Sequence, residues 1–158
     1  MTITLPPFAV SQFTTWHLSF EQDVELYRKC NVDGIELCER KLSPDRQQAM
    51  RQLGLLRDSG LKVASVQPRC HALFPDSMSP DPAEPQRRVK CYEQTIDMIA
   101  EAFPGQDIPL VTLTGIAPER NLRHAHETAS RLYQALADYA GDRGLRIMLE
   151  PLHPMFMN

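Results

Sequence analysis

A glutamate and a histidine near the end of the chain carry side chains that can transfer protons and bind cations. Glu150 ends a compact β-prone run, and His153 lies three residues later. A carboxylate can act as a general acid or base and can coordinate a divalent ion. An imidazole beside it can orient a substrate or the groups that bind it. Glu150 is therefore the candidate catalytic and metal-ligating residue, and His153 is a candidate substrate-binding residue.

Three further side chains lie on or just after other β-prone runs. Glu36 lies within one such run, where a buried carboxylate needs a partner, so it either binds substrate or pairs with a cation such as Arg69. His71 follows the third run, in a position where loops often carry function. Trp16 follows the first run and forms either a wall of a binding site or a packed rim. We predict that Trp16, Glu36 and His71 contact the substrate.

The elements that must position these residues alternate between strands and helices. The predicted strands cover residues 8–14, 35–39, 61–67, 108–114 and 145–150. The first helix begins at Ser19, whose hydroxyl can form a capping box with Gln22. Because a crossover helix is the usual way to join parallel strands, this alternation predicts a parallel sheet.

The remaining helices carry more specific expectations. The second begins at Ser43-Pro44, with proline at the favoured first position, and the third begins with a solvated Arg87-Arg88 pair after a proline-rich loop over residues 68–86. The fourth covers roughly residues 118–142. Its predicted apolar face consists of Leu122, Ala125, Ala129, Leu132, Leu136 and Tyr139.

The strand ends distinguish a barrel from an open sheet. A flavodoxin-like open sheet of five strands is the alternative, but it normally has a closing helix after its last strand, and only residues 151–158 follow here. Polar side chains also lie at or near every strand end, which suits the mouth of a (β/α)8 barrel. Because a complete barrel takes about 250 residues, we predict an α/β chain of TIM-barrel type that stops after strand five.

Composition excludes several other classes of protein. The chain has 158 residues and a net charge of −3, so nothing favours nucleic acid or an anionic membrane as a partner. Its N-terminus lacks the pattern of a secretory signal, and its four cysteines form no CxxC pair. We expect a cytoplasmic protein with free thiols. No linker or change in composition divides the sequence, so we predict a single domain over residues 1–158.

Two segments resemble the xylose-isomerase-like family of sugar phosphate isomerases and epimerases. The first joins Ser19-Phe20-Glu21-Gln22-Asp23 to Val32-Asp33-Gly34-Ile35-Glu36-Leu37. The second and more specific one is Leu149-Glu150-Pro151-Leu152-His153-Pro154-Met155. The order of elements is similar to the N-terminal half of that family's barrel.

The resemblance implies a metal-dependent enzyme. In this family four side chains from strands five to eight hold a divalent ion, and Glu150 matches the first of them, while the positions of the other three are absent from this sequence. The implied cofactor is Mn2+, Mg2+ or Zn2+. The implied reaction is isomerisation or epimerisation of a small sugar, or of a ketone derived from a sugar, by proton transfer beside a carbonyl. With one carboxylate of the set, the 158-residue chain is expected to be inactive alone.

Two other functions stay open at this point. Similar barrels act as lyases that remove water from a keto-inositol. A non-catalytic half-barrel that associates with itself is the contrasting possibility, since an open parallel sheet leaves an edge and apolar faces uncovered. A homo-oligomer is compatible with either function.

Overall fold

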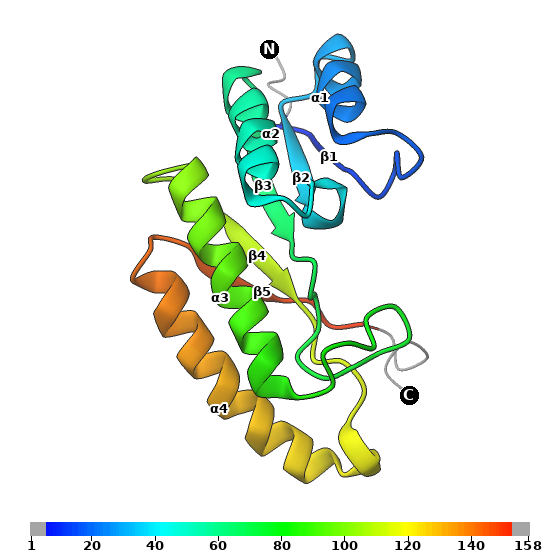
Figure 1. Ribbon diagram of the computed structural model, residues 1–158, viewed down its shortest axis with the longest axis vertical. Helices are drawn as coiled ribbons and strands as arrows, with labels where there is room; N and C mark the ends of the chain where they lie inside the picture. The colour runs from blue at the N-terminus through cyan, green and yellow to red at the C-terminus, as the bar shows by residue number, and fades with distance from the viewer. Residues whose placement is uncertain (1–5, 153–158) are drawn as a thin grey trace, which may run out of the picture. The chain divides into compact units, whose positions relative to one another are not determined.

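The computed structural model describes residues 6–152 of the chain. It contains two compact units, Met1–Val66 and Gln67–Asn158, each of which is described by itself. Strands and helices alternate along both units, as the sequence pattern predicts (Figure 1). The prediction of a single domain over residues 1–158 stays a prediction.

The first unit is a small parallel sheet with two helices. Its elements are β1 (Ala9–Ser11), α1 (Phe20–Lys29), β2 (Gly34–Cys38), the short 3-10 turn η1 (Glu39–Lys41), α2 (Arg46–Asp58) and β3 (Lys62–Gln67). β1 pairs with β2 in parallel, with Ser11 opposite Glu36, and β3 lies on the other side of β2. Ile35 and Leu37 of β2 are fully buried and form the centre of this unit's core.

The caps of the two helices test the sequence prediction locally. At α1 the prediction is confirmed, since the Ser19 hydroxyl accepts from the amide of Gln22 and the Gln22 side chain accepts from the amide of Ser19. At α2 it is wrong, because the cap is Asp45, whose carboxylate accepts from the amide of Gln48 at 2.8 Å. Ser43 lies before the helix, and its amide donates to the Gln52 side chain at 2.8 Å. Pro44 is therefore outside the helix rather than at its first position.

The second unit contains the two longest helices and a pair of parallel strands. Its elements are α3 (Pro85–Ala102), β4 (Pro109–Thr112), the short 3-10 turn η2 (Pro118–Arg120), α4 (Leu122–Gly141) and β5 (Arg146–Leu149). β4 and β5 pair in parallel, with Thr112 opposite Leu149. α3 and α4 pack side by side (Figure 1).

The predicted apolar face of α4 is confirmed in its middle and wrong at its start. Ala125, Ala129 and Leu136 are buried, but the side chain of Leu122 is 75% exposed. Leu122 is the first residue of the helix, immediately after the Asn121 cap, where the chain has only begun to turn towards the core.

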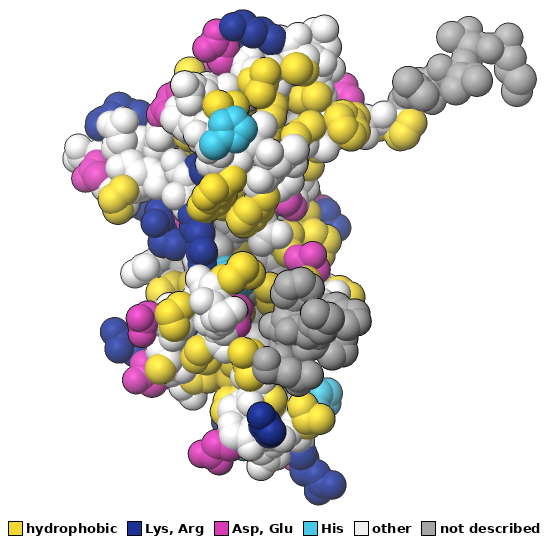
Figure 2. Space-filling view, turned by 90° about the vertical axis from the view of Figure 1, so that its right-hand side faces the viewer, with side chains coloured by type: hydrophobic (Ala, Val, Ile, Leu, Met, Phe, Trp, Pro, Cys, Tyr) yellow, Lys and Arg dark blue, Asp and Glu magenta, His cyan; other side chains and the backbone are white. Residues whose placement is uncertain are grey.

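The surface carries side chains of mixed charge. On the face drawn in Figure 2, basic side chains are interspersed with acidic and hydrophobic ones. No helix between residues 6 and 152 is long and apolar enough to cross a membrane.

A glycine after β4 cannot be replaced by another residue without strain, because of its backbone conformation and its close contact. Gly115 has a φ of +80°, and a Cβ at this position would overlap the carbonyl oxygen of Phe74. Gly144, before β5, has a similar φ of +73° but nothing within 4 Å of the position of a Cβ.

We predict that Gly115→Ala destabilises the chain more than Gly144→Ala. Both substitutions place a side chain in the left-handed region, at a cost of about 1–2 kcal/mol. Only Gly115→Ala adds a backbone overlap, which brings its total to about 3 kcal/mol or more. The free energy of unfolding in urea measures both, and equal losses would contradict the overlap.

Candidate functional site

The loop after β3 is held against the segment after β4 by backbone hydrogen bonds. The amide of Leu113 donates to the carbonyl of His71 at 2.8 Å, and the amide of Leu73 donates to the carbonyl of Leu113 at 2.9 Å. Ala72 and Leu113 form a parallel β-bridge, and the amide of Phe74 donates to the carbonyl of Thr114 at 2.8 Å. The first part of the predicted loop is therefore an ordered extension of the sheet, and it places His71 beside the end of β4.

The side chain of His71 is fixed by an aspartate of the same loop. Its Nε2 lies 3.1 Å from an oxygen of Asp76, and the two side chains are 10% and 7% exposed. The other oxygen of Asp76 accepts from the amides of Met78 and Ser79 at 2.9 and 2.7 Å. A carboxylate held in this way fixes the orientation of the imidazole ring.

A buried arginine anchors the rest of the loop, which sequence analysis did not predict. Arg88 of α3 is fully buried, and its guanidinium donates to the carbonyl oxygens of Ala72, Ser79 and Pro82. The expected solvated pair is thus wrong for Arg88 and right for Arg87, whose side chain is 72% exposed. Burial of Arg88 is tolerated because its guanidinium has several N–H donors in one rigid plane, which can satisfy several loop carbonyls at once.

Glu150 lies directly after β5 on the opposite side of the same segment of β4. Its amide donates to the carbonyl of Thr112 at 2.9 Å, and the residue is exposed. The Thr112 carbonyl and the Leu113 amide belong to one peptide group, so His71 and Glu150 flank that group from two sides. With strands about 4.8 Å apart, their backbones are separated by about 10 Å. The structure therefore places these two predicted residues on the two sides of the end of β4.

A tyrosine of α4 supports the same backbone segment. The hydroxyl of Tyr133 donates to the carbonyl of Leu113 at 2.5 Å. Burial raises the pKa of Tyr133 to about 12, so the phenol stays protonated and keeps donating at neutral pH.

In the first unit the end of β1 is held by a buried charge network. Gln12 is fully buried, and its amide group donates to Asp23 at 2.9 Å and accepts from the backbone amide of Cys38 at 2.8 Å. Lys41 donates to the same oxygen of Asp23 at 2.6 Å and to the carbonyl of Thr15 at 2.7 Å. The side chains of Lys41 and Asp23 are 5% and 0% exposed. Asp23 lies among the apolar residues of α1, which was the one available signal for its burial.

This network fixes the segment that bears Trp16. The ring of Trp16 stacks on that of Phe13, with centroids 5.5 Å apart and planes 6° apart. Trp16 is 52% exposed and Phe13 is 49% exposed, so the pair presents a flat aromatic surface to solvent. Such a surface can bind the apolar face of a small molecule.

Glu36 accepts a hydrogen bond within the first unit. Its carboxylate accepts from the hydroxyl of Ser65 on β3 at 2.7 Å. It is partly exposed, in contrast to its buried neighbours Ile35 and Leu37. Sequence analysis did not consider Ser65 as a partner of Glu36, and the suggested pairing of Glu36 with a cation such as Arg69 stays a prediction.

The predicted site residues are distributed over both units. His153 lies outside the described residues. Trp16 and Glu36 belong to the first unit, whereas His71 and Glu150 belong to the second. Among residues 6–152 no group of three or more His, Cys, Asp or Glu side chains is placed to hold a metal ion.

Comparison with a family model decides the class of the protein. Residues 24–158 match the model described as xylose isomerase-like TIM barrel. The chain belongs to this family. The predicted TIM-barrel class is therefore confirmed, and the flavodoxin-like alternative is not supported. No curated protein matches the chain at a significant level.

Solved structures of xylose isomerase-like proteins have the same fold. A protein from Sinorhizobium meliloti 1021 is 21% identical over 95% of this chain and 52% of its own, with a TM-score of 0.73. D-psicose 3-epimerase from Clostridium cellulolyticum H10, solved with D-tagatose, is 13% identical over 94% of this chain and 53% of its own, with a TM-score of 0.69. 3-Keto-D-glucoside 4-epimerase from E. coli is 15% identical over 85% of this chain and 52% of its own, with a TM-score of 0.60. The chain thus spans about half the length of the structures it matches.

We predict that Lys41→Met strongly destabilises this xylose isomerase-like chain. The change leaves the Asp23 carboxylate buried without its cation, which costs about 3–5 kcal/mol. Lys29→Met is the matched control, because Lys29 pairs with Glu25 at 2.6 Å while their side chains are 70% and 66% exposed. That exposed pair contributes at most about 1 kcal/mol. Similar losses of unfolding free energy in both variants would show that the buried network does not carry the stability assigned to it.

Proposed function

We propose that this chain carries part of the active site of a sugar isomerase or epimerase. The observation that carries the proposal is the exposed carboxylate of Glu150 at the end of β5, separated from His71 by one peptide group of β4. Active sites of TIM barrels lie at these carboxyl ends of the strands. Membership of the family and the two epimerases among the matched structures support the same class of reaction.

The reaction that suits this carboxylate is proton transfer at a carbon beside a carbonyl. Glu150 removes or returns the proton, and its exposure leaves it accessible to a small substrate. His71, whose ring is held by Asp76, lies on the other side of the end of β4 and binds a hydroxyl or carbonyl oxygen of the substrate. Trp16 and Glu36 are proposed as further substrate contacts, and His153 keeps that role as a proposal from sequence.

A divalent metal is part of the proposal. The oxygen of an exposed carboxylate is a donor that Mg2+ and Mn2+ prefer, and a histidine in the set admits Zn2+. Residues 6–152 fit one position of such a set and do not form a complete site. When bound, the ion would supply positive charge against the oxygen that becomes negative as the proton leaves. We therefore propose that the 158 residues alone have no appreciable turnover. The proposed location of the protein is the cytoplasm.

We predict that Glu150→Gln abolishes isomerase activity in the longest form of the protein found in its source cells. Loss of a general acid or base costs about 100-fold to 10,000-fold in rate. Glu127→Gln is the matched control, because Glu127 is an exposed carboxylate on α4. D-psicose and D-tagatose are the first substrates to test, with and without a chelator, and the rate is followed by chromatography of the ketoses.

The outcomes of this assay separate the candidate reactions. Unchanged turnover in Glu150→Gln or in the chelated protein would refute the proposed roles of the carboxylate or the metal. Release of water from a keto-inositol, with no change in the ketoses, would instead identify a lyase.

Self-association through β5 is a second candidate function that one observation favours. Met148 and Leu149 of β5 are 43% and 53% exposed. Within the described residues, no strand pairs with the edge of β5 that faces away from β4. An exposed strand edge with apolar side chains is suited to pairing with another strand.

We predict that the purified 158-residue chain forms dimers whose dissociation constant rises at least about tenfold in Met148→Lys, because a charge at an apolar contact opposes burial. Leu122→Lys is the matched control, since Leu122 is 75% exposed and lies on α4 rather than on the strand edge. Sedimentation velocity measures both. A concentration-independent monomer would refute this candidate function.

A further inference from the structure

Two cysteines of the second unit come together beside the buried arginine. Cys70, in the loop after β3, is 6% exposed, and its sulfur accepts from the guanidinium of Arg88 at 3.5 Å. Cys91 lies three residues after Arg88 on α3, which places it one helical turn further along the same face. The Cys91 thiol is one of the groups that raise the pKa of Cys70, which places the two side chains near each other. Cys70 on the loop and Cys91 on the helix thus lie near the same turn of α3.

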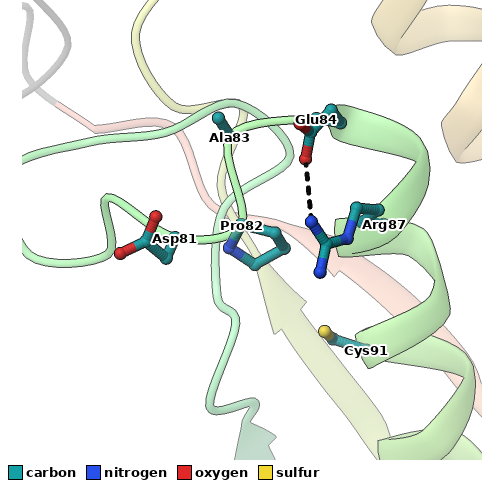
Figure 3. Close-up of a pocket in the computed structure, with 6 residues that line it drawn as sticks. All are labelled: Asp81, Pro82, Ala83, Glu84, Arg87 and Cys91. Carbon is teal, nitrogen blue, oxygen red and sulfur yellow. Dashed lines mark hydrogen bonds and ion pairs between the residues drawn. The ribbon is translucent and has the colours of Figure 1, made fainter.

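Cys91 is accessible from solvent through a hollow at the start of α3. The hollow has a volume of about 530 Å3 and is lined by Asp81, Pro82, Ala83, Glu84, Arg87 and Cys91. In Figure 3 the sulfur of Cys91 and the guanidinium of Arg87 both project from α3 towards the segment around Pro82. A small oxidant that enters the hollow therefore meets the Cys91 thiol beside a cation.

We propose that Cys70 and Cys91 are an oxidation site that forms an intrachain disulfide with peroxide. The Cys91 thiolate attacks one oxygen of hydrogen peroxide, the O–O bond breaks, and a sulfenic acid and hydroxide result. The sulfur of Cys70 then attacks the sulfur of Cys91, the S–S bond forms and the S–O bond breaks. The proton of the Cys70 thiol leaves with the departing hydroxide as water. In total two thiols lose two hydrogen atoms, and one peroxide is reduced to two molecules of water.

The environment assigns the order of these steps. Burial raises the pKa of Cys70 to about 11, and the Arg88 guanidinium offsets part of that increase. Cys91 is less buried and lines the hollow, so it meets the oxidant first. Cys70 is protected from solvent and reacts only with the sulfenic acid beside it.

The disulfide would fasten the residue before His71 to α3. In the reduced chain the guanidinium of Arg88 already holds the loop to the helix through three loop carbonyls. With the disulfide, a closed loop of about 20 residues forms, which restricts the unfolded chain and stabilises the folded unit.

The chain contains its own controls. Cys38 is buried in the first unit, and Cys30 is exposed there. If burial alone determined reactivity, Cys38 would therefore behave like Cys70. If exposure alone determined it, Cys30 would be oxidised first.

The test is peptide mapping of the whole chain after treatment with hydrogen peroxide, followed by alkylation of free thiols under denaturing conditions. We expect a peptide pair that joins Cys70 to Cys91, lighter by two hydrogen atoms than the two thiol peptides, which disappears on reduction. Cys30→Ser should retain this pair, and Cys91→Ser should lose it while Cys70 becomes alkylated. The melting temperature should rise on oxidation in the wild type and in Cys30→Ser, and not in Cys91→Ser.

Two results would overturn the proposal. One is a Cys91 peptide found as a sulfinic or sulfonic acid while Cys70 remains alkylated. The other is a disulfide between two chains through Cys30 with no Cys70–Cys91 pair.

Discussion

The candidate site of the second unit depends on a single peptide group between Thr112 and Leu113. Its carbonyl accepts from Glu150 and its amide donates to His71, so the two residues that can do chemistry are placed relative to each other by backbone hydrogen bonds. Backbone pairing of this kind is insensitive to the side chains that flank it, because each residue supplies the same donor and acceptor. The sheet can thus hold the site constant while the loops beyond it vary.

Buried charges then hold the loops that the sheet alone would leave free. In the second unit Arg88 binds three carbonyls of the loop after β3, and in the first unit Lys41 and Asp23 hold the end of β1. Both arrangements bury a charge, and pairing or hydrogen bonds to that charge reduce the cost of its burial. The same physical device therefore fixes the candidate residues of each unit.

Much of the fold could be predicted because local signals determine it. The capping box at Ser19 is a property of four adjacent residues, and the alternation of strands with helices follows from hydrophobic periodicity. Glu150 could be selected as a strand-end carboxylate for the same reason. Where a feature depends on contacts between distant residues, prediction was incomplete or wrong. The sequence of α3 is compatible with either a solvated or a buried Arg88. The partners of Arg88 are known only once the loop has folded against the helix.

The site shows the same division. His71 and Glu150 were found as single residues, but the peptide group that connects them depends on how the end of β4 pairs with β5 and with the loop after β3. Asp23 could have been noticed, since it lies among Phe20, Val24 and Tyr27 on α1, and its partner Lys41 gives no such signal. Leu122 was wrongly predicted to be buried. The periodicity of α4 extends its apolar face into the first turn, where the fold leaves Leu122 exposed.

The proposed proton transfer by Glu150 at a carbon beside a carbonyl is tested most directly with solvent deuterium. A ketose substrate is converted by the active protein in D2O, and the product and the recovered substrate are examined by NMR. We expect deuterium at the carbon where configuration or bonding changes, and none there in Glu150→Gln. Conversion without solvent deuterium would show that hydrogen passes directly between two carbons of the substrate, and would contradict the role assigned to this carboxylate.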